Sequence, residues 1–136
     1  MSFAPPAAFD TPPASTGRER LVDPLADSGE RVYATFTHLS LLLWHVLIPV
    51  VPALVMWLIR RNDSPFLDDH GRESVNFQIS LLLYGVLGLA LTPLCGIGVA
   101  VWVAAYILGI VGMVMGSVAA HKGQYFRYPA CIRFLR

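Results

Sequence analysis

Residues 64–80 read SPFLDDHGRESVNFQIS and gather acidic, imidazole and guanidinium groups at the start of a long apolar run. His70 and Glu73 stand three residues apart, so on a helix they lie on neighbouring positions of one face. Carboxylate and imidazole groups in such a pattern are typical of metal ligands, an acid–base pair or a proton relay. They are equally typical of a helix start, where Asp68 and Asp69 favour the positive end of the helix dipole.

The patterns for metal binding and for nucleophilic catalysis are incomplete. A di-iron bundle uses two Glu-x-x-His motifs and two further glutamates. This chain has one His/Glu pair at that spacing, His70 and Glu73, and no His-Glu-x-x-His zinc motif. No Ser or Cys stands in a nucleophile elbow beside a histidine. A proton or ion path along four residues stays open: His38, His45, Glu73 and Tyr84. Helix capping with hydrogen bonds between helices is the preferred interpretation, so we predict no catalytic residues, no metal site and no cofactor.

The composition indicates a membrane protein. Of the 136 residues, 55% are hydrophobic and 14% are charged, whereas a soluble domain carries about 25% charged residues. Residues 74–120 contain no Asp, Glu, Lys or Arg. At about 1.5 Å per helical residue, this run is long enough to cross a hydrocarbon core of about 30 Å twice. A second uncharged run covers residues 32–59, so we predict an integral membrane protein whose main partner is the lipid bilayer.

Start and turn signals divide the long uncharged run into two helices. Ser64 and Pro65 predict a helix start, because serine caps free N–H groups and proline suits the first helical position. The stretch TPLCGIG, residues 92–98, contains one proline and two glycines and predicts a turn. We therefore expect one helix from about residue 65 to 91 and another from about 97 to 122.

The first apolar segment contains Pro49 and Pro52, and two prolines so close together break or strongly kink a helix. Residues 32–59 then either cross the membrane once as a kinked helix or enter and leave on one side as a re-entrant hairpin. Lysine and arginine are retained on the cytoplasmic side of membranes, and a hairpin places all ten of them on one side. We therefore prefer the hairpin, and predict an all-α membrane helical bundle with three apolar segments that form four short helices.

Residues 1–29 are rich in Pro, Ala, Ser and Asp without apolar periodicity. This composition predicts a disordered tail, followed by a membrane-embedded domain over residues 30–136. The first ten residues lack a basic region, so no signal peptide is expected. The charge rule places the 60–73 loop and the C-terminal tail in the cytoplasm and the 92–98 turn outside. A net charge of +1 without a basic cluster predicts no nucleic-acid partner.

Polar residues continue into the apolar runs on one helical face each. At about 100° per residue, four residues of the second run share one sector, which we call the polar stripe: Glu73, Asn76, Ser80 and Tyr84. His38 and His45 share a face of the first run in the same way. Polar groups inside a membrane face the bundle interior. We therefore expect the two faces to meet, with His38 or His45 near Glu73 or Asn76.

Small residues recur at spacings of three or four in the last apolar segment: Ala105, Gly109, Gly112, Gly116 and Ala120. Such spacing lets helix backbones approach closely, which drives helix association in lipid. Gly109, Gly112 and Gly116 are therefore predicted packing positions. They pack within the chain, against Gly85 and Gly88, or they form a face for a second copy or another membrane protein.

Three stretches together resemble a known family: TFTHLS at 35–40, WLIRRNDSPFLDDHGRESVNFQIS at 57–80 and AAHKGQYFRYPACIRFLR at 119–136. They are similar to the bacterial Tic-twenty-like membrane proteins, a group that also holds the magnetosome membrane protein MamF. The Tic-twenty subunit of the chloroplast translocon is a distant relative of this group. The family pattern falls on twelve residues of this chain. Six of them form its polar cluster: His38, His70, Glu73, Asn76, Gln78 and Tyr128. The other six are Ser64, Pro65, Phe66, Phe77, Gly123 and Pro129.

The resemblance implies a small helical bundle without established enzymatic activity, in the inner membrane of a bacterium, with both termini on one side. One departure is that members often place a glycine-containing turn between the two prolines, where this chain has Val50 and Val51. Our first hypothesis is a non-enzymatic multi-pass membrane protein that acts through helix packing and association, as a scaffold or assembly component. The alternative is a pore or translocation component, and a metal-dependent membrane enzyme is the third.

Overall fold

The computed structural model describes residues 20–45, 49–94 and 96–136. These residues form four α-helices and one 3-10 helix in the order α1 (Ser28–Leu39), η1 (Ser40–His45), α2 (Val51–Arg60), α3 (Pro65–Leu91) and α4 (Ile97–His121). An isolated antiparallel bridge joins Val22 to Gln124, and the described residues contain no strand. The prediction of an all-α helical bundle is confirmed.

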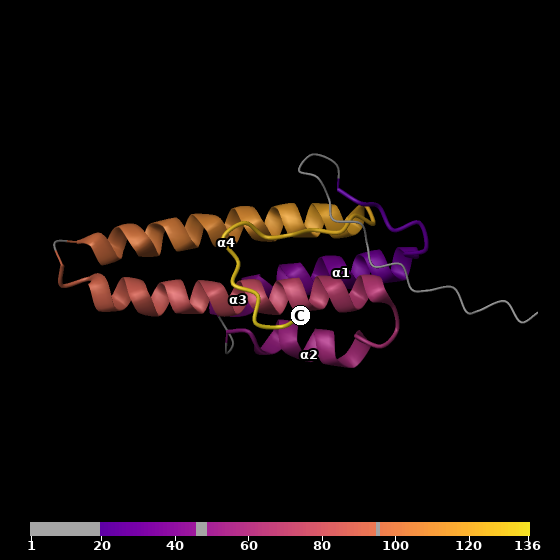
Figure 1. Ribbon diagram of the computed structural model, residues 1–136, viewed down its shortest axis with the longest axis horizontal. Helices are drawn as coiled ribbons and strands as arrows, with labels where there is room; N and C mark the ends of the chain where they lie inside the picture. Colours follow the sequence, from indigo (N-terminus) through magenta and orange to yellow (C-terminus); the bar gives the residue numbers. More distant parts are fainter. Residues whose placement is uncertain (1–19, 46–48, 95) are drawn as a thin grey trace, which may run out of the picture.

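The two long helices form the frame of the molecule. α3 and α4 lie side by side as an antiparallel pair, joined by a short connection between Leu91 and Ile97 (Figure 1). Near this connection the backbones touch, because a Cβ on Gly98 would overlap the carbonyl oxygen of Gly88. The predicted helix limits agree with the structure to within one residue. Each helix contains an 18-residue window of high mean hydropathy, 1.6 in α3 and 2.3 in α4, and both helices are long and apolar enough to cross a membrane.

The first apolar segment is broken, as its prolines predict. η1 ends at His45, and α2 begins at Val51 with Pro52 in its first turn. Val50, where the resemblance leads us to expect a glycine-containing turn, has a φ of 73°, a left-handed conformation that favours glycine. α1 and α2 form a hairpin that starts and finishes at the end of the bundle where α3 begins (Figure 1). The hairpin covers only the adjacent half of α3 and α4.

Residues 20–29, which the sequence assigns to the tail, take part in the fold. Asp27 and Glu30 form a capping box at the start of α1, in which each side chain accepts a hydrogen bond from the backbone N–H of the other residue. The backbone N–H of Asp23 donates to the Gly123 carbonyl oxygen. The sequence DSGE at 27–30 carries this start signal. The predicted disorder of residues 1–19 stays a prediction, because they lie outside the described residues.

After α4 the chain continues in extended form as residues 124–136, which we call the C-terminal strap. The strap runs back along α4 and then crosses α3 (Figure 1). Gly123, which precedes it, and Ala130, within it, have positive φ values of 68° and 53°. These two residues lie where the chain changes direction.

Buried apolar side chains form two clusters. The first lies where the N-terminal segment, α1, α3 and α4 meet: Ala26, Ala34, Phe66, Leu67 and Ala120. The second joins α3 and α4 to the strap: Phe77, Leu81, Ala119, Phe126 and Tyr128. The strap is therefore part of the core.

Candidate functional site

Three buried side chains from three elements form a continuous hydrogen-bonded chain. Nδ1 of His38 lies 2.7 Å from the Tyr128 hydroxyl oxygen, and Nε2 of His38 lies 2.7 Å from Nδ1 of His70. α1, α3 and the strap supply one residue each. All three residues are at most 3% exposed. The structure thus brings together three of the six residues of the polar cluster.

Burial dictates how protons are placed in this chain of groups. Desolvation raises the pKa of the Tyr128 hydroxyl well above its ordinary value, and the nearby Glu73 carboxylate adds to the effect. Tyr128 therefore keeps its proton. In the His38 tautomer that carries its proton on Nε2, the Tyr128 hydroxyl donates to Nδ1 of His38, and Nε2 of His38 donates to Nδ1 of His70. Nε2 of His70 is buried and has no hydrogen-bond partner among the described residues. Tyr128 and His70, at the two ends of this hydrogen-bonded series, are both closed to solvent. His38, His70 and Tyr128 therefore suit a structural joint.

Two glycines of α4 lie directly against this joint. A Cβ on Gly116 would come within 2.7 Å of the Tyr128 hydroxyl oxygen and 3.1 Å of Nδ1 of His38. A Cβ on Gly112 would come within 2.6 Å of the Phe77 ring. The rings of Phe77 and Tyr128 stack with centroids 3.8 Å apart and 7° between their planes. Both glycines are thus needed for the strap and α3 to approach α4.

The partners of the predicted packing glycines differ from those expected. Gly109 lies against Leu81 of α3, where an added Cβ would come within 3.3 Å of a methyl group. Gly88 instead lies against Gly98 and Trp102 at the far end of the α3–α4 pair. Within the chain, Gly109, Gly112 and Gly116 therefore meet large side chains, and the α4 glycine that meets a glycine of α3 is Gly98.

The polar stripe of α3 binds the strap through its backbone. Oδ1 of Asn76 accepts hydrogen bonds from the N–H groups of Phe134 and Leu135 at 3.1 and 2.9 Å. Nδ2 of Asn76 donates to the Leu135 carbonyl oxygen at 3.0 Å. Oγ of Ser80 accepts from the Ile132 N–H at 2.8 Å. These side chains satisfy backbone groups that an extended segment cannot satisfy itself.

The last residue of the polar stripe, Tyr84, donates its hydroxyl proton to the Ala130 carbonyl oxygen at 2.6 Å. The polar stripe thus bonds to the strap, and His38 bonds to His70, while the approach of His38 or His45 to Glu73 or Asn76 stays a prediction. The stripe bonds to the strap because the backbone groups of a helix are already paired, whereas those of the strap are not. The side chain of His45 lies outside the described residues.

Opposite charges add to the attachment of the strap. Glu73 is 4% exposed, and its Oε1 accepts from Nε of Arg133 at 2.9 Å, while its Oε2 accepts from the Tyr128 N–H at 3.4 Å. Arg127 donates two hydrogen bonds of 2.6 Å to the Asp69 carboxylate, which raises the pKa of this guanidinium. No motif in the sequence predicts a role for Arg127 and Arg133. Their opposite charge to Asp69 and Glu73 was the available signal.

Gln78 is the sixth residue of the polar cluster, and it faces the α1–α2 hairpin. Its Nε2 donates to Oγ of Ser40 at 3.2 Å, and Ser40 in turn donates to the Thr37 carbonyl oxygen at 2.6 Å. Ser74 donates to the same carbonyl at 3.1 Å. These bonds close the C-terminal end of α1. The sequence does not predict the role of Thr37, Ser40 and Ser74, because their only signal is a small hydroxyl group among apolar neighbours.

The acidic start of α3 has a structural role. Ser64 caps the helix by accepting from the Leu67 N–H at 3.3 Å, as predicted. Asp68 accepts from the indole N–H of Trp57 in α2 at 2.8 Å and pairs with Arg72. Among residues 20–45, 49–94 and 96–136, no three His, Cys, Asp or Glu side chains form a group that could hold a metal ion. Asp68 thus links α2 to α3.

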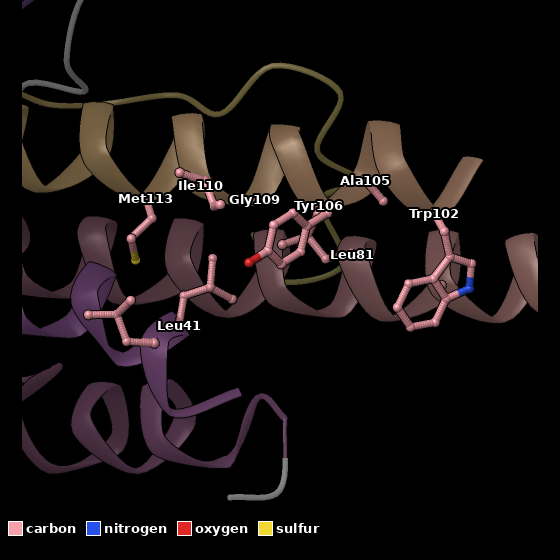
Figure 2. Close-up of a pocket in the computed structure, with 10 residues that line it drawn as sticks. Leu41, Leu81, Trp102, Ala105, Tyr106, Gly109, Ile110 and Met113 are labelled. Carbon is pink, nitrogen blue, oxygen red and sulfur yellow. The ribbon is translucent and has the colours of Figure 1, made fainter. Parts of the chain in front are cut away.

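An apolar pocket of about 390 Å³ lies between α3, α4 and the tip of the α1–α2 hairpin (Figure 2). Figure 2 shows Leu41 of η1 on one side and Tyr106 and Trp102 of α4 on the other. The residues that line it carry no charge: Leu41, Leu42, Leu81, Gly85, Trp102, Ala105, Tyr106, Gly109, Ile110 and Met113. Such a lining suits hydrocarbon and offers no charged catalytic group.

The arrangement defines a class of protein: a small helical membrane protein whose polar side chains hold its helices and its C-terminal strap together. The chain belongs to the magnetosome magnetite crystal formation protein family, whose model matches residues 29–135. This family is not one of known enzymes, and its match confirms the resemblance to the group that holds MamF. The relation to the Tic-twenty translocon subunit stays a prediction. No curated protein and no solved structure matches the chain.

Proposed function

We propose that this protein is a non-enzymatic, multi-pass scaffold or assembly component of a membrane in which magnetite crystals form. The observation that supports it most is the use of the buried polar groups. His38, Glu73 and Asn76 are bonded to other parts of the same chain. A protein built in this way presents an apolar outer surface for association rather than a reactive centre.

The outer surface supports association through the membrane-length helices. Large apolar side chains along α4 are half exposed, and they recur on its outer face: Val99, Val103, Ile107, Ile110 and Val114. In lipid, such a face contacts acyl chains or other membrane proteins, since both are apolar. Its partners are therefore other copies of the chain or other proteins of the same membrane.

The proposed topology follows from charge and length. α3 and α4 cross the inner membrane of a bacterium, and the α1–α2 hairpin enters and leaves on one side. The described Lys and Arg residues fall in three stretches, 20–31, 60–72 and 122–136. These stretches lie toward the end of the bundle where α3 begins (Figure 1). Because positive charge is retained in the cytoplasm, that end is the cytoplasmic one.

The test is recovery of the protein, tagged at its N-terminus, from native membranes in mild detergent. We expect a reproducible partner set or a homo-oligomer, identified by mass spectrometry and by particle size. The control is Gly116→Leu, whose side chain would overlap Tyr128 and His38 and open the bundle. Partners that bind the folded surface should be lost from this variant. Recovery of single chains, or of about one zinc or iron ion per chain, would contradict the proposal.

A further inference from the structure

The strap is held differently on the two sides of Ala130. Before this residue the strap is buried, with Phe126 and Tyr128 in the core. After it, residues 131–136, which we call the terminal segment, are held by side chains that bind backbone atoms. Asn76 and Ser80 supply four such hydrogen bonds, of 2.8–3.1 Å. We call this part of α3 the backbone-binding groove, because these hydrogen bonds go to backbone atoms of the terminal segment and not to its side chains.

The charge of Glu73 favours a segment that carries an arginine. Glu73, at one end of the groove, is 4% exposed and accepts from Arg133 at 2.9 Å. An extended segment that places an arginine beside this carboxylate therefore fits better than a neutral one. The terminal segment of a second copy has this arginine at the required position, because its sequence is the same.

The turn at Ala130 is strained. Its φ of 53° places an alanine in the left-handed region, which L side chains rarely adopt. Beyond the turn, the terminal segment leaves Ile132 and Phe134 43% and 53% exposed. The segment thus buries its backbone against α3 while its apolar side chains stay uncovered. A second copy that contacts this face would cover them.

We propose that residues 131–136 exchange between two copies of the chain, so that each terminal segment occupies the backbone-binding groove of the other copy. Exchange keeps every hydrogen bond of the groove and the Glu73–Arg133 pair, and it lets Ala130 leave the left-handed region. Ile132 bonds to Ser80 in the groove, so only Cys131 links it to Ala130, and these two steps of the chain span up to about 7 Å. The exchange therefore requires the two copies to pack so that Ala130 of each lies about this close to the groove of the other. The inference rests on the proposed function, because it names the contact through which copies associate.

A disulfide can show which copy supplies the terminal segment. Oγ of Ser80 lies 3.9 Å from Sγ of Cys131, so Ser80→Cys places two sulfur atoms within bonding reach. One copy carries Ser80→Cys, Cys95→Ser and Cys131→Ser, and a second, with a different N-terminal tag, carries only Cys95→Ser. The two are co-expressed, oxidised in their membranes and separated by size. A disulfide between the tags then requires exchange.

Two controls make the result decisive. A single chain with Ser80→Cys and native Cys131 reports the bond within one copy. Leu89→Cys, on the exposed far half of α3, replaces Ser80→Cys to report random collision. We expect the mixed-tag bond well above this background. Ala130→Gly accepts the left-handed turn at no cost, so it should lower the mixed-tag yield about tenfold. Ala130→Pro forbids the turn, so it should abolish the bond within one copy and leave the mixed-tag bond.

A mixed-tag yield at the collision background, while the bond within one copy forms, would overturn the exchange. Absence of both bonds would overturn the groove itself. If association in native membranes persists in the first case, only the exchange fails. If single chains are recovered there, the proposed function fails as well.

Discussion

His38 is the residue at which α1, α3 and the strap meet. One of its ring nitrogens is bonded to His70 and the other to Tyr128. Because His38 is 1% exposed, its two partners are shielded from bulk water in the folded chain. A substitution here therefore leaves two buried polar groups without a partner at once, which is costlier than the loss of a surface bond.

The first prediction compares His38→Ala with Tyr128→Phe. Each buried group left unsatisfied costs about 1–3 kcal/mol of the free energy of unfolding. His38→Ala leaves two such groups and a cavity, whereas Tyr128→Phe leaves one and keeps the ring stacked on Phe77. We expect His38→Ala to lower the melting temperature in detergent more than Tyr128→Phe. The double variant should be more stable than the sum of the two effects predicts, because both remove the same bond. Strictly additive effects would argue against a shared bond.

The small residues in the second half of α4 lie against large side chains of α1, α3 and the strap. Gly112 and Gly116 lie against Phe77 and Tyr128, so the packing is between a flat glycine surface and an aromatic pair. A helix with β-carbons at these positions could not approach the strap. The glycines therefore set the distance between elements rather than the flexibility of α4.

A series of Gly→Ala variants tests this reading. In a helix, alanine is more stable than glycine by about 0.5–1 kcal/mol. Gly85→Ala should gain this amount, because its nearest neighbour is an atom of Trp102 at 3.9 Å, an ordinary contact. Gly112→Ala and Gly116→Ala should instead lose about 1–3 kcal/mol through overpacking. Thermal unfolding in one detergent gives all three values, and a shift of all three in one direction would refute the matched packing.

The limits of the elements could be predicted from the sequence, but their contacts could not. Ser64 and Pro65 fix the start of α3 by local chemistry, so the prediction needed no knowledge of the rest of the chain. The sector of Glu73 and Asn76 was also predicted, because helical period gives the direction of a side chain. It does not give the partner. The strap escaped prediction because it has no period and its bonds use backbone atoms, which leave no pattern in the sequence.

The whole molecule is a long helical pair that is covered over only half its length. The α1–α2 hairpin, the N-terminal segment and the strap surround the half of α3 and α4 that carries charge (Figure 1). The other half is apolar and exposes residues such as Leu89 and Val99. In a bilayer, this division places the covered half toward one face and the bare half in contact with lipid or other proteins.

The membrane topology of the chain can be tested by cysteine labelling. Single cysteines replace three exposed residues, Leu25, Asn62 and Leu94, in a chain that carries Cys95→Ser and Cys131→Ser. In spheroplasts, a membrane-impermeant thiol reagent should label position 94 alone. In inverted vesicles it should label positions 25 and 62. Labelling of positions 25 and 62 from opposite sides would mean that the first apolar segment crosses the membrane once.

The docking of the strap on α3 has a consequence for the order of events during synthesis. The residues that satisfy Glu73, Asn76 and Ser80 follow them by 51 to 60 positions. At about 5–20 residues per second, a ribosome needs roughly 3–12 s to cover that distance. During this time α3 is complete but its polar stripe has no partner, so water at the membrane face or another protein must serve instead. Folding of this bundle therefore finishes only after residues 128–135 have been made.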